Sequence, residues 1–126
     1  MEERRLGRMI SQVCSSEGWE LGATGVLLSL SDGRRQLVAA ESFDFENEEF
    51  LRLRTTIGSA AELGPARMEA ALRINAELVH GALAVWDDHL VIVDTHMLRG
   101  TNESELAANL RYLAETADYY ERSLFG

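Results

Sequence analysis

The sequence predicts an α+β domain that occupies the whole chain of 126 residues, in the order helix, three strands, helix, two strands, helix. Apolar residues recur with helical spacing near both ends, in residues 2–17 and 102–124. Between these segments, the turn signals Asp32-Gly33 and Asp87-Asp88 each separate two runs with the composition of β-strands. These observations predict five strands, with a central helix between two hairpins.

The predicted strands alternate apolar with polar side chains over much of their length, which is the period of a half-buried strand. They cover residues 26–31, 35–45, 50–57, 82–86 and 90–93. The acidic run 46–49 is expected to be a turn, and residues 58–64 a loop that leads into the central helix. No linker composition divides the chain, so a single domain is expected.

The central helix is predicted to run from Pro65 to Val79, because proline suits the first helical position, where its missing N–H has no partner to lose. Its polar side chains form one narrow stripe of Glu69, Arg73 and Glu77 at i, i+4 spacing. The apolar arc covers roughly 240°, whereas a one-sided surface helix needs only ~100°. We therefore expect cover on two sides, from the chain's own sheet and from a second copy of the chain.

A homodimer built on this helix is the predicted assembly. An uncovered apolar row would be the kind of contiguous patch that marks an interaction site, and a two-fold axis lets such a patch cover itself. One row contains Met68, Leu72, Ala76 and Val79, and the other contains Ala70, Ile74 and Leu78. The pattern leaves the choice of row open, and the second row is preferred. The predicted interface residues are Ala70, Ala71, Ile74, Leu78 and Trp86.

The second hairpin is apolar on both faces. With a two-residue turn, Val85 pairs with Leu90 and Leu83 pairs with Ile92 on one face. The other face carries Ala82, Ala84, Trp86, Val91 and Val93. A sheet face in water would alternate apolar with polar residues, so this pattern favours cover on both faces. Trp86 is interpreted equally well as a binding anchor or as packing at the end of the sheet.

The composition excludes several classes of function. The formal net charge of −9 disfavours nucleic-acid binding, because neutralising phosphates needs lysine and arginine. All twelve basic residues are arginine, which excludes Schiff-base chemistry and a P-loop lysine. Cys14 is the single cysteine, so no intrachain disulfide forms, and a buried thiol is preferred to a nucleophile. No apolar run approaches the ~20 residues of a membrane span, so a cytoplasmic protein without a membrane partner is expected.

The first helix is predicted over residues 2–17 and ends at Gly18, a residue that favours helix termination. Its apolar stripe consists of Leu6, Met9, Ile10 and Val13. Arg4, Arg5 and Arg8 lie mostly opposite the stripe. We interpret them as a solvated helix face rather than an anion site, because acidic residues adjoin them.

The last helix has a strong start signal. Asn102 is a good N-cap, and Glu105 three positions later completes a capping box. An apolar seam of period 3.5 follows, made by Leu106, Leu110, Leu113, Ala117, Tyr120 and Leu124. Such a seam fits a coiled coil or a helix lying on a sheet, and the short length favours sheet cover.

With this order of elements, three segments resemble the superfamily of YbjN and the type III secretion chaperones. They are residues 72–83, the strand 90–93, and residues 97–100 followed by a helix opened by Asn102 and Glu103. The resemblance implies a small acidic homodimer with a twisted antiparallel sheet, five-stranded here, and helices packed against it. It also implies one of two roles. Secretion chaperones hold an extended segment of a client protein on apolar patches, whereas YbjN-type proteins are linked to stress and motility regulation.

The three histidines are the candidate metal ligands. His89 and His96 should project from opposite faces of the second hairpin, because their separation is odd. His80 would lie opposite Thr95, so a cluster of His80, Asp94 and His96 would require a register shift. No metal site is therefore predicted. The acidic turn with Glu46, Glu48 and Glu49 lacks EF-hand spacing, and a solvated turn is preferred there.

The predicted function is a non-enzymatic, homodimeric protein-binding module, chaperone-like or regulatory, without a cofactor. The chain lacks Gly-x-Ser-x-Gly, His-Glu-x-x-His and Gly-x-Gly-x-x-Gly motifs. Its acidic charge favours partners with basic segments. The alternative is a small-molecule-binding or enzymatic domain on the same scaffold, which a deep polar pocket lined by Asp94, His96 or Glu41 would support.

Overall fold

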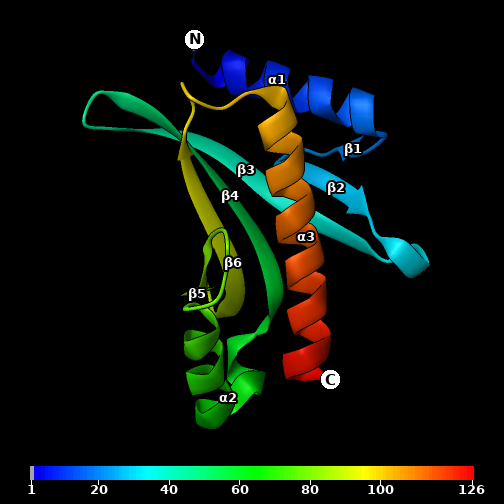
Figure 1. Ribbon diagram of the computed structural model, residues 1–126, viewed down its shortest axis with the longest axis vertical. Helices are drawn as coiled ribbons and strands as arrows, with labels where there is room; N and C mark the ends of the chain where they lie inside the picture. The colour runs from blue at the N-terminus through cyan, green and yellow to red at the C-terminus, as the bar shows by residue number, and fades with distance from the viewer. Residues whose placement is uncertain (1) are drawn as a thin grey trace.

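An antiparallel sheet, with strand order β1-β2-β3-β4-β6-β5, forms the frame of the molecule (Figure 1). The computed structural model describes residues 2–126, with the side chains of Glu2, Glu3, Arg4 and Asp32 excepted. Its elements are α1 (Glu2–Glu17), β1 (Glu20–Leu21), β2 (Gly25–Ser29), the 3-10 helix η1 (Ser31–Gly33), β3 (Arg35–Phe45), β4 (Glu48–Ser59), α2 (Ala60–Ile74), β5 (Ala82–Trp86), β6 (His89–Met97) and α3 (Glu103–Phe125). The predicted α+β class is confirmed. The sheet has six strands rather than five, because the short β1 pairs with β2.

The core lies between one face of the sheet and the helix α3, which crosses that face, with α1 over the N-terminal half of α3 (Figure 1). The predicted capping box is present, with Asn102 Oδ1 accepting from the Glu105 N–H at 2.8 Å. Five residues of the predicted seam are buried, namely Leu106, Leu110, Leu113, Ala117 and Leu124. Sheet cover is therefore the role of α3. The stripe of α1 is buried together with Cys14, whose thiol has a raised pKa because of burial.

An ion pair joins α3 to the connection between β2 and β3. Arg34 donates from Nε and Nη2 to the two carboxylate oxygens of Asp118, both at 2.9 Å, and Asp118 is only 5% exposed. The hydrogen bonds from Arg34 lower the pKa of Asp118, against the opposing effect of burial. The two residues are 84 positions apart, and no local pattern in the sequence predicts the pair.

The central helix differs from the prediction at both ends. It begins at Ala60, breaks at Gly64, where φ is +79°, and continues from Pro65, which is the first residue after the break as predicted. It ends at Ile74 rather than Val79. The side chain of Asn75 explains this end, because its Oδ1 accepts from the Leu83 N–H at 2.6 Å and its Nδ2 donates to the Leu83 carbonyl at 3.3 Å. Residues 75–77 continue only as a turn with i→i−3 backbone hydrogen bonds, and Asn75 ties this turn to β5.

Both long hairpins turn through two residues with positive φ. Asp87 and Asp88 have φ of 50° and 63°, and Glu46 and Asn47 have φ of 51° and 66°. Two such residues match the twist of the flanking strands. The predicted pairs Val85–Leu90 and Leu83–Ile92 are confirmed, and β6 is longer than predicted. None of the described helices is both long and apolar enough to cross a membrane.

Candidate partner-binding surface

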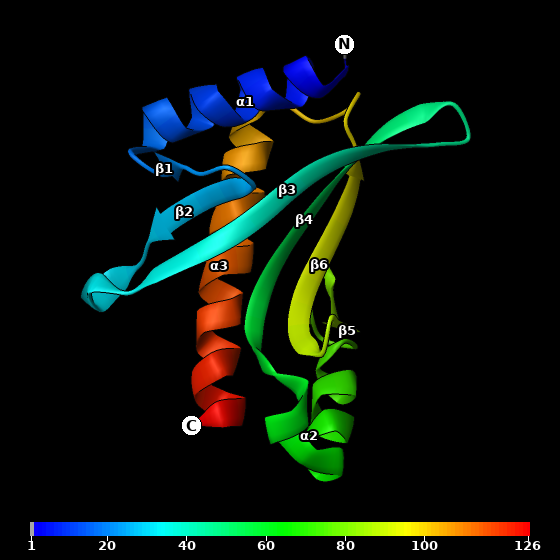
Figure 2. The same ribbon diagram turned by 180° about the vertical axis from the view of Figure 1, so that it is seen from behind.

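The two faces of the sheet differ in cover, and β4 shows the difference within one strand. Leu51, Leu53, Thr55 and Ile57 are buried on the face that α3 covers. The intervening residues Phe50, Arg52, Arg54 and Thr56 project from the opposite face, since successive strand residues alternate between faces. In Figure 2 this helix-free face is turned to the viewer, with β3 and β4 in front of α3. The helix-free face is therefore the part of the sheet that is open to a partner.

The helix-free face carries an arginine–aromatic surface, made of Phe43, Phe45, Phe50, Arg52, Arg54 and Trp86. Phe43 and Phe50 are paired across β3 and β4, and their rings stack with centroids 5.7 Å apart. Phe45 contacts Phe50 edge to face at 6.1 Å. Phe45 is 58% exposed, so this cluster presents apolar area to solvent.

Each arginine of this surface lies over an aromatic ring. The Cζ of Arg52 is 4.3 Å from the ring centroid of Phe43, and the Cζ of Arg54 is 4.3 Å from that of Trp86. Such cation–π contacts hold the guanidinium group close to the ring. Arg52 Nε also donates to Thr95 Oγ1 at 3.3 Å. The positive groups are thus fixed in place on the sheet.

Two hollows share Arg52. One, of about 290 Å³, is lined by Phe43, Phe45, Phe50, Arg52 and Thr95. The other, of about 340 Å³, is lined by Ala23, Thr24, Ala39, Ala40, Glu41, Arg52 and Arg54. Glu41, named above as a possible pocket residue, therefore lies beside the arginines of the helix-free face. The second hollow is lined by two arginines and one glutamate, so its lining carries one surplus positive charge. An apolar hollow next to it suits a ligand that carries both apolar and acidic groups.

The end of the molecule formed by α2 and the edge strand β5 is the second exposed apolar region. Leu72 is 61% exposed, Val79 75% and Val85 55%. Of the predicted interface residues, Ala70 is exposed and Trp86 is 39% exposed.

The other predicted interface residues do not offer a free surface. Ala71 is buried by its own chain, and this part of the prediction is corrected. Ile74 and Leu78 are partly buried against the core, and Leu78 lies beyond the end of the helix. The exposed row of α2 is therefore the one that contains Leu72.

Comparisons with known proteins bear on the fold. No protein-family model matches the chain, and no curated protein matches its sequence. A chain of the ExsC–ExsE complex matches with a TM-score of 0.69 and 13% identity, over 97% of this chain and 95% of that chain. The type III secretion chaperone SycH of Yersinia pestis, solved with a stable fragment of YscM2, matches with a TM-score of 0.54 and 17% identity, over 87% of this chain and 94% of that chain. The fold is that of the type III secretion chaperones.

YbjN of E. coli shares this chaperone-like fold. Its TM-score is 0.51 with 18% identity, over 90% of this chain and 86% of that chain. The resemblance inferred from the sequence is therefore confirmed at the level of the fold. Because the identities are below 20%, the similarity shows a shared fold only. Nothing about the arginine–aromatic surface is inferred from these neighbours.

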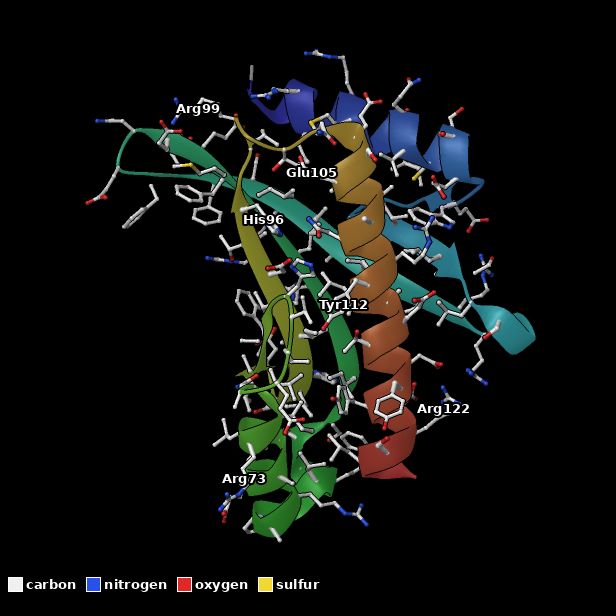
Figure 3. All side chains as sticks on the ribbon, viewed as in Figure 1. Arg73, His96, Arg99, Glu105, Tyr112 and Arg122 are labelled. Atoms are coloured by element: carbon white, nitrogen blue, oxygen red, sulfur yellow. The ribbon has the colours of Figure 1, made fainter. Side chains whose placement is uncertain are left out.

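The histidines occupy three separate places in the chaperone-like fold. His96 lies on the helix-covered face, with Nε2 2.7 Å from Asp94 Oδ2 and 3.2 Å from Asn109 Nδ2 of α3 (Figure 3). His89 projects from the opposite face as predicted, and its Nδ1 contacts the Asp87 carbonyl. The ring of His80 packs edge to face on Tyr112 of α3. In the part of the chain that the structure describes, no three His, Cys, Asp or Glu side chains gather at a metal-binding distance.

The remaining charged candidates lie on the surface. Arg73 pairs with Glu69 at 2.6 Å on the outer side of α2, where Figure 3 labels it. Glu48 of the acidic turn pairs with Arg99 at 2.9 Å. Arg5 donates to the Leu98 carbonyl at 3.4 Å, and the side chain of Arg4 lies outside the described residues.

Proposed function

We propose that the chain is a non-enzymatic, homodimeric protein-binding module that holds an extended segment of a partner protein, in a chaperone-like or regulatory role. One observation carries the proposal: a sheet face that no helix covers presents the arginine–aromatic surface to solvent. Exposed contiguous apolar area, edged by polar groups, marks protein interaction sites, and aromatic and arginine side chains dominate their energetics. The cytoplasm is the proposed compartment.

The structural neighbours support the same reading. SycH was solved with a fragment of YscM2, and ExsC was solved in complex with ExsE. Their partners are polypeptides, and the chaperone-like fold covers nearly the whole of this chain. A polypeptide is therefore the proposed ligand here as well.

The proposed dimer is built on the end formed by α2 and β5. Leu72, Val79 and Val85 are more than half exposed there, and Ala70 and Trp86 extend the same region. An apolar patch that repeats on each copy is self-complementary about a two-fold axis. The phenylalanines and Arg52 of the helix-free face lie outside this dimer region and stay open for the partner segment, and Trp86 is the residue that the two regions share.

Site-specific photo-crosslinking tests the proposal. A photoreactive phenylalanine analogue is placed at Phe45, which is 58% exposed on the helix-free face, and the matched control carries it at Tyr119, which is 56% exposed on α3. The proteins are irradiated in lysate of the cells that produce them. We expect adducts at position 45, with each crosslinked peptide mapping to one continuous segment of a partner. Adducts that form equally at position 119, or at neither position, would contradict the proposal.

A further inference from the structure

The arginine–aromatic surface has a local charge opposite to that of the whole chain. The chain carries a formal net charge of −9. Within the described side chains, Arg52 and Arg54 form no ion pair with a carboxylate, whereas Arg35, Arg73, Arg99, Arg111 and Arg122 each do. Two half-buried cations therefore remain available on this face. Glu41 is exposed and lies opposite Arg52 in the register of β3 on β4, so these three side chains together carry one surplus positive charge. Charge complementarity on this face points to an acidic ligand, although the net charge favours a basic one.

The geometry of the two guanidinium groups suits carboxylates. The Cζ of each group lies 4.3 Å from a ring centroid, so the ring shields one side of the group from water. Arg52 Nε already donates to Thr95 Oγ1, and the other N–H groups of the planar guanidinium can donate in pairs to a carboxylate. Less additional ordering of the side chain is needed when the carboxylate binds, because the contact with the ring already restrains the guanidinium group.

The spacing along β4 matches an extended chain. Phe50, Arg52 and Arg54 are alternate residues, and alternate residues of a strand are about 7 Å apart on one face. An extended segment of a partner has the same period of two. A segment with an apolar side chain followed by acidic side chains two and four positions away would meet the phenylalanine hollow, Arg52 and Arg54 in turn.

We propose that the arginine–aromatic surface selects an extended segment of a partner protein in which apolar and acidic side chains occupy alternate positions. This inference rests on the proposed protein-binding function and adds the chemistry of the partner. The phenylalanines Phe43, Phe45 and Phe50 take the apolar side chain, and Arg52 and Arg54 pair with the carboxylates.

Fluorescence anisotropy with three labelled peptides tests this selection. Each peptide has about ten residues, with phenylalanine and two test residues at alternate positions and threonine or serine between them. The test residues are glutamate, glutamine or lysine. The chain is compared as wild type, as the double variant Arg52→Gln/Arg54→Gln, and as the control Arg73→Gln, which removes an arginine from the exposed side of α2. Circular dichroism and thermal unfolding confirm that all three are folded.

We expect wild type and Arg73→Gln to bind the glutamate peptide about tenfold more tightly than the glutamine peptide, with the difference shrinking as salt is raised. The double variant should bind both peptides with the same dissociation constant. Preference for the lysine peptide, or equal binding of glutamate and glutamine peptides by wild type, would overturn the inference. In those cases the crosslinking at Phe45 still decides the protein-binding function independently.

Two other occupants of the same face give different results. A labelled single-stranded RNA that binds wild type more tightly than the glutamate peptide, and loses that binding in the double variant, would overturn the inference in favour of nucleic acid. A second copy of the chain on this face would make the double variant change the dimer mass in light scattering without any peptide present. That result would also overturn the inference.

Discussion

The two faces of β4 show how one strand serves two purposes. Leu53 is fully buried under the helices, and its neighbour Arg54 lies on the helix-free face over Trp86. The covered face of β4 is mainly aliphatic, with Leu51, Leu53 and Ile57 buried, whereas its helix-free face carries Phe50, Arg52 and Arg54, which remain partly exposed. Successive residues of a strand point to opposite faces, so residues that stabilise the fold alternate along β4 with residues that are available for binding. Variants on the two faces should therefore change different measured quantities.

The largest expected effect is on the covered face. Leu53→Ala removes a fully buried side chain and leaves a cavity, so it should lower the free energy of unfolding by about 2–5 kcal/mol. Urea unfolding followed by circular dichroism measures this change. Arg54→Ala, on the other face of the same strand, should lose about 1 kcal/mol or less, because it removes one surface cation–π contact. Equal losses in both variants would contradict the separation of the faces.

The second prediction concerns the end formed by α2 and β5. Leu72→Asp places an unpaired charge in the proposed dimer interface, and it should weaken self-association about 100-fold while the monomer stays folded. Size exclusion coupled to light scattering measures the mass across a concentration series. Glu69→Asp on the solvated stripe of α2 is the control and should leave the mass unchanged. A wild type that stays monomeric at high micromolar concentration would rule out the dimer.

The third prediction uses pH to test the attachment of α3. Asp118→Asn weakens the pairing with Arg34 and should lower the free energy of unfolding by about 1–3 kcal/mol at pH 7. The pKa of Asp118 is lower in the folded state than in the unfolded state. The ionised carboxylate therefore stabilises the folded state at pH values above the unfolded pKa, and this contribution is lost as the pH falls through the folded pKa. The difference between wild type and variant should therefore shrink below about pH 4. A difference that stays constant from pH 7 to pH 3 would show that the ion pair does not supply it.

The smallest predicted effect concerns the start of α3, the helix that covers the core face. Asn102→Ala removes the acceptor for the Glu105 N–H and should lower the free energy of unfolding by about 1 kcal/mol. Thermal unfolding and urea unfolding both measure it. Asn102→Ser keeps a capping oxygen and should restore most of the loss. If serine is no better than alanine, the capping bond does not account for the effect.

The elements that the sequence predicts correctly depend on local patterns. The capping box at Asn102, the turn Asp87-Asp88 and the pairing of Val85 with Leu90 each involve residues close together in the chain. The seam of α3 is equally local, because a helix repeats every 3.6 residues. Side-chain periodicity is therefore enough to identify the order of elements and the covered face.

The parts that the sequence does not predict depend on contacts between elements. The central helix ends early because Asn75 bonds to Leu83 in the next strand, which helical periodicity cannot reveal. The pair of Arg34 and Asp118 joins distant segments. The arginine–aromatic surface forms only because the register of β3 on β4 brings Phe43 beside Phe50, and because Arg54 of β4 extends across β6 to Trp86 of β5. The one local signal was the alternation of Phe50, Arg52 and Arg54, which also fits an ordinary solvated strand face.

The separation of the two faces is tested most directly by measuring unfolding and binding on two neighbouring residues. Leu53→Val and Arg54→Gln are each assayed for the free energy of unfolding in urea and for the dissociation constant of the labelled glutamate peptide. We predict that Leu53→Val lowers the free energy of unfolding by about 1 kcal/mol and leaves the dissociation constant unchanged. Arg54→Gln should raise the dissociation constant about threefold, since it removes one of the two arginine–carboxylate pairs, and change the free energy of unfolding by less than about 1 kcal/mol. If each variant changes both quantities together, the two faces are not separate, and the assignment of the helix-free face to partner binding is wrong.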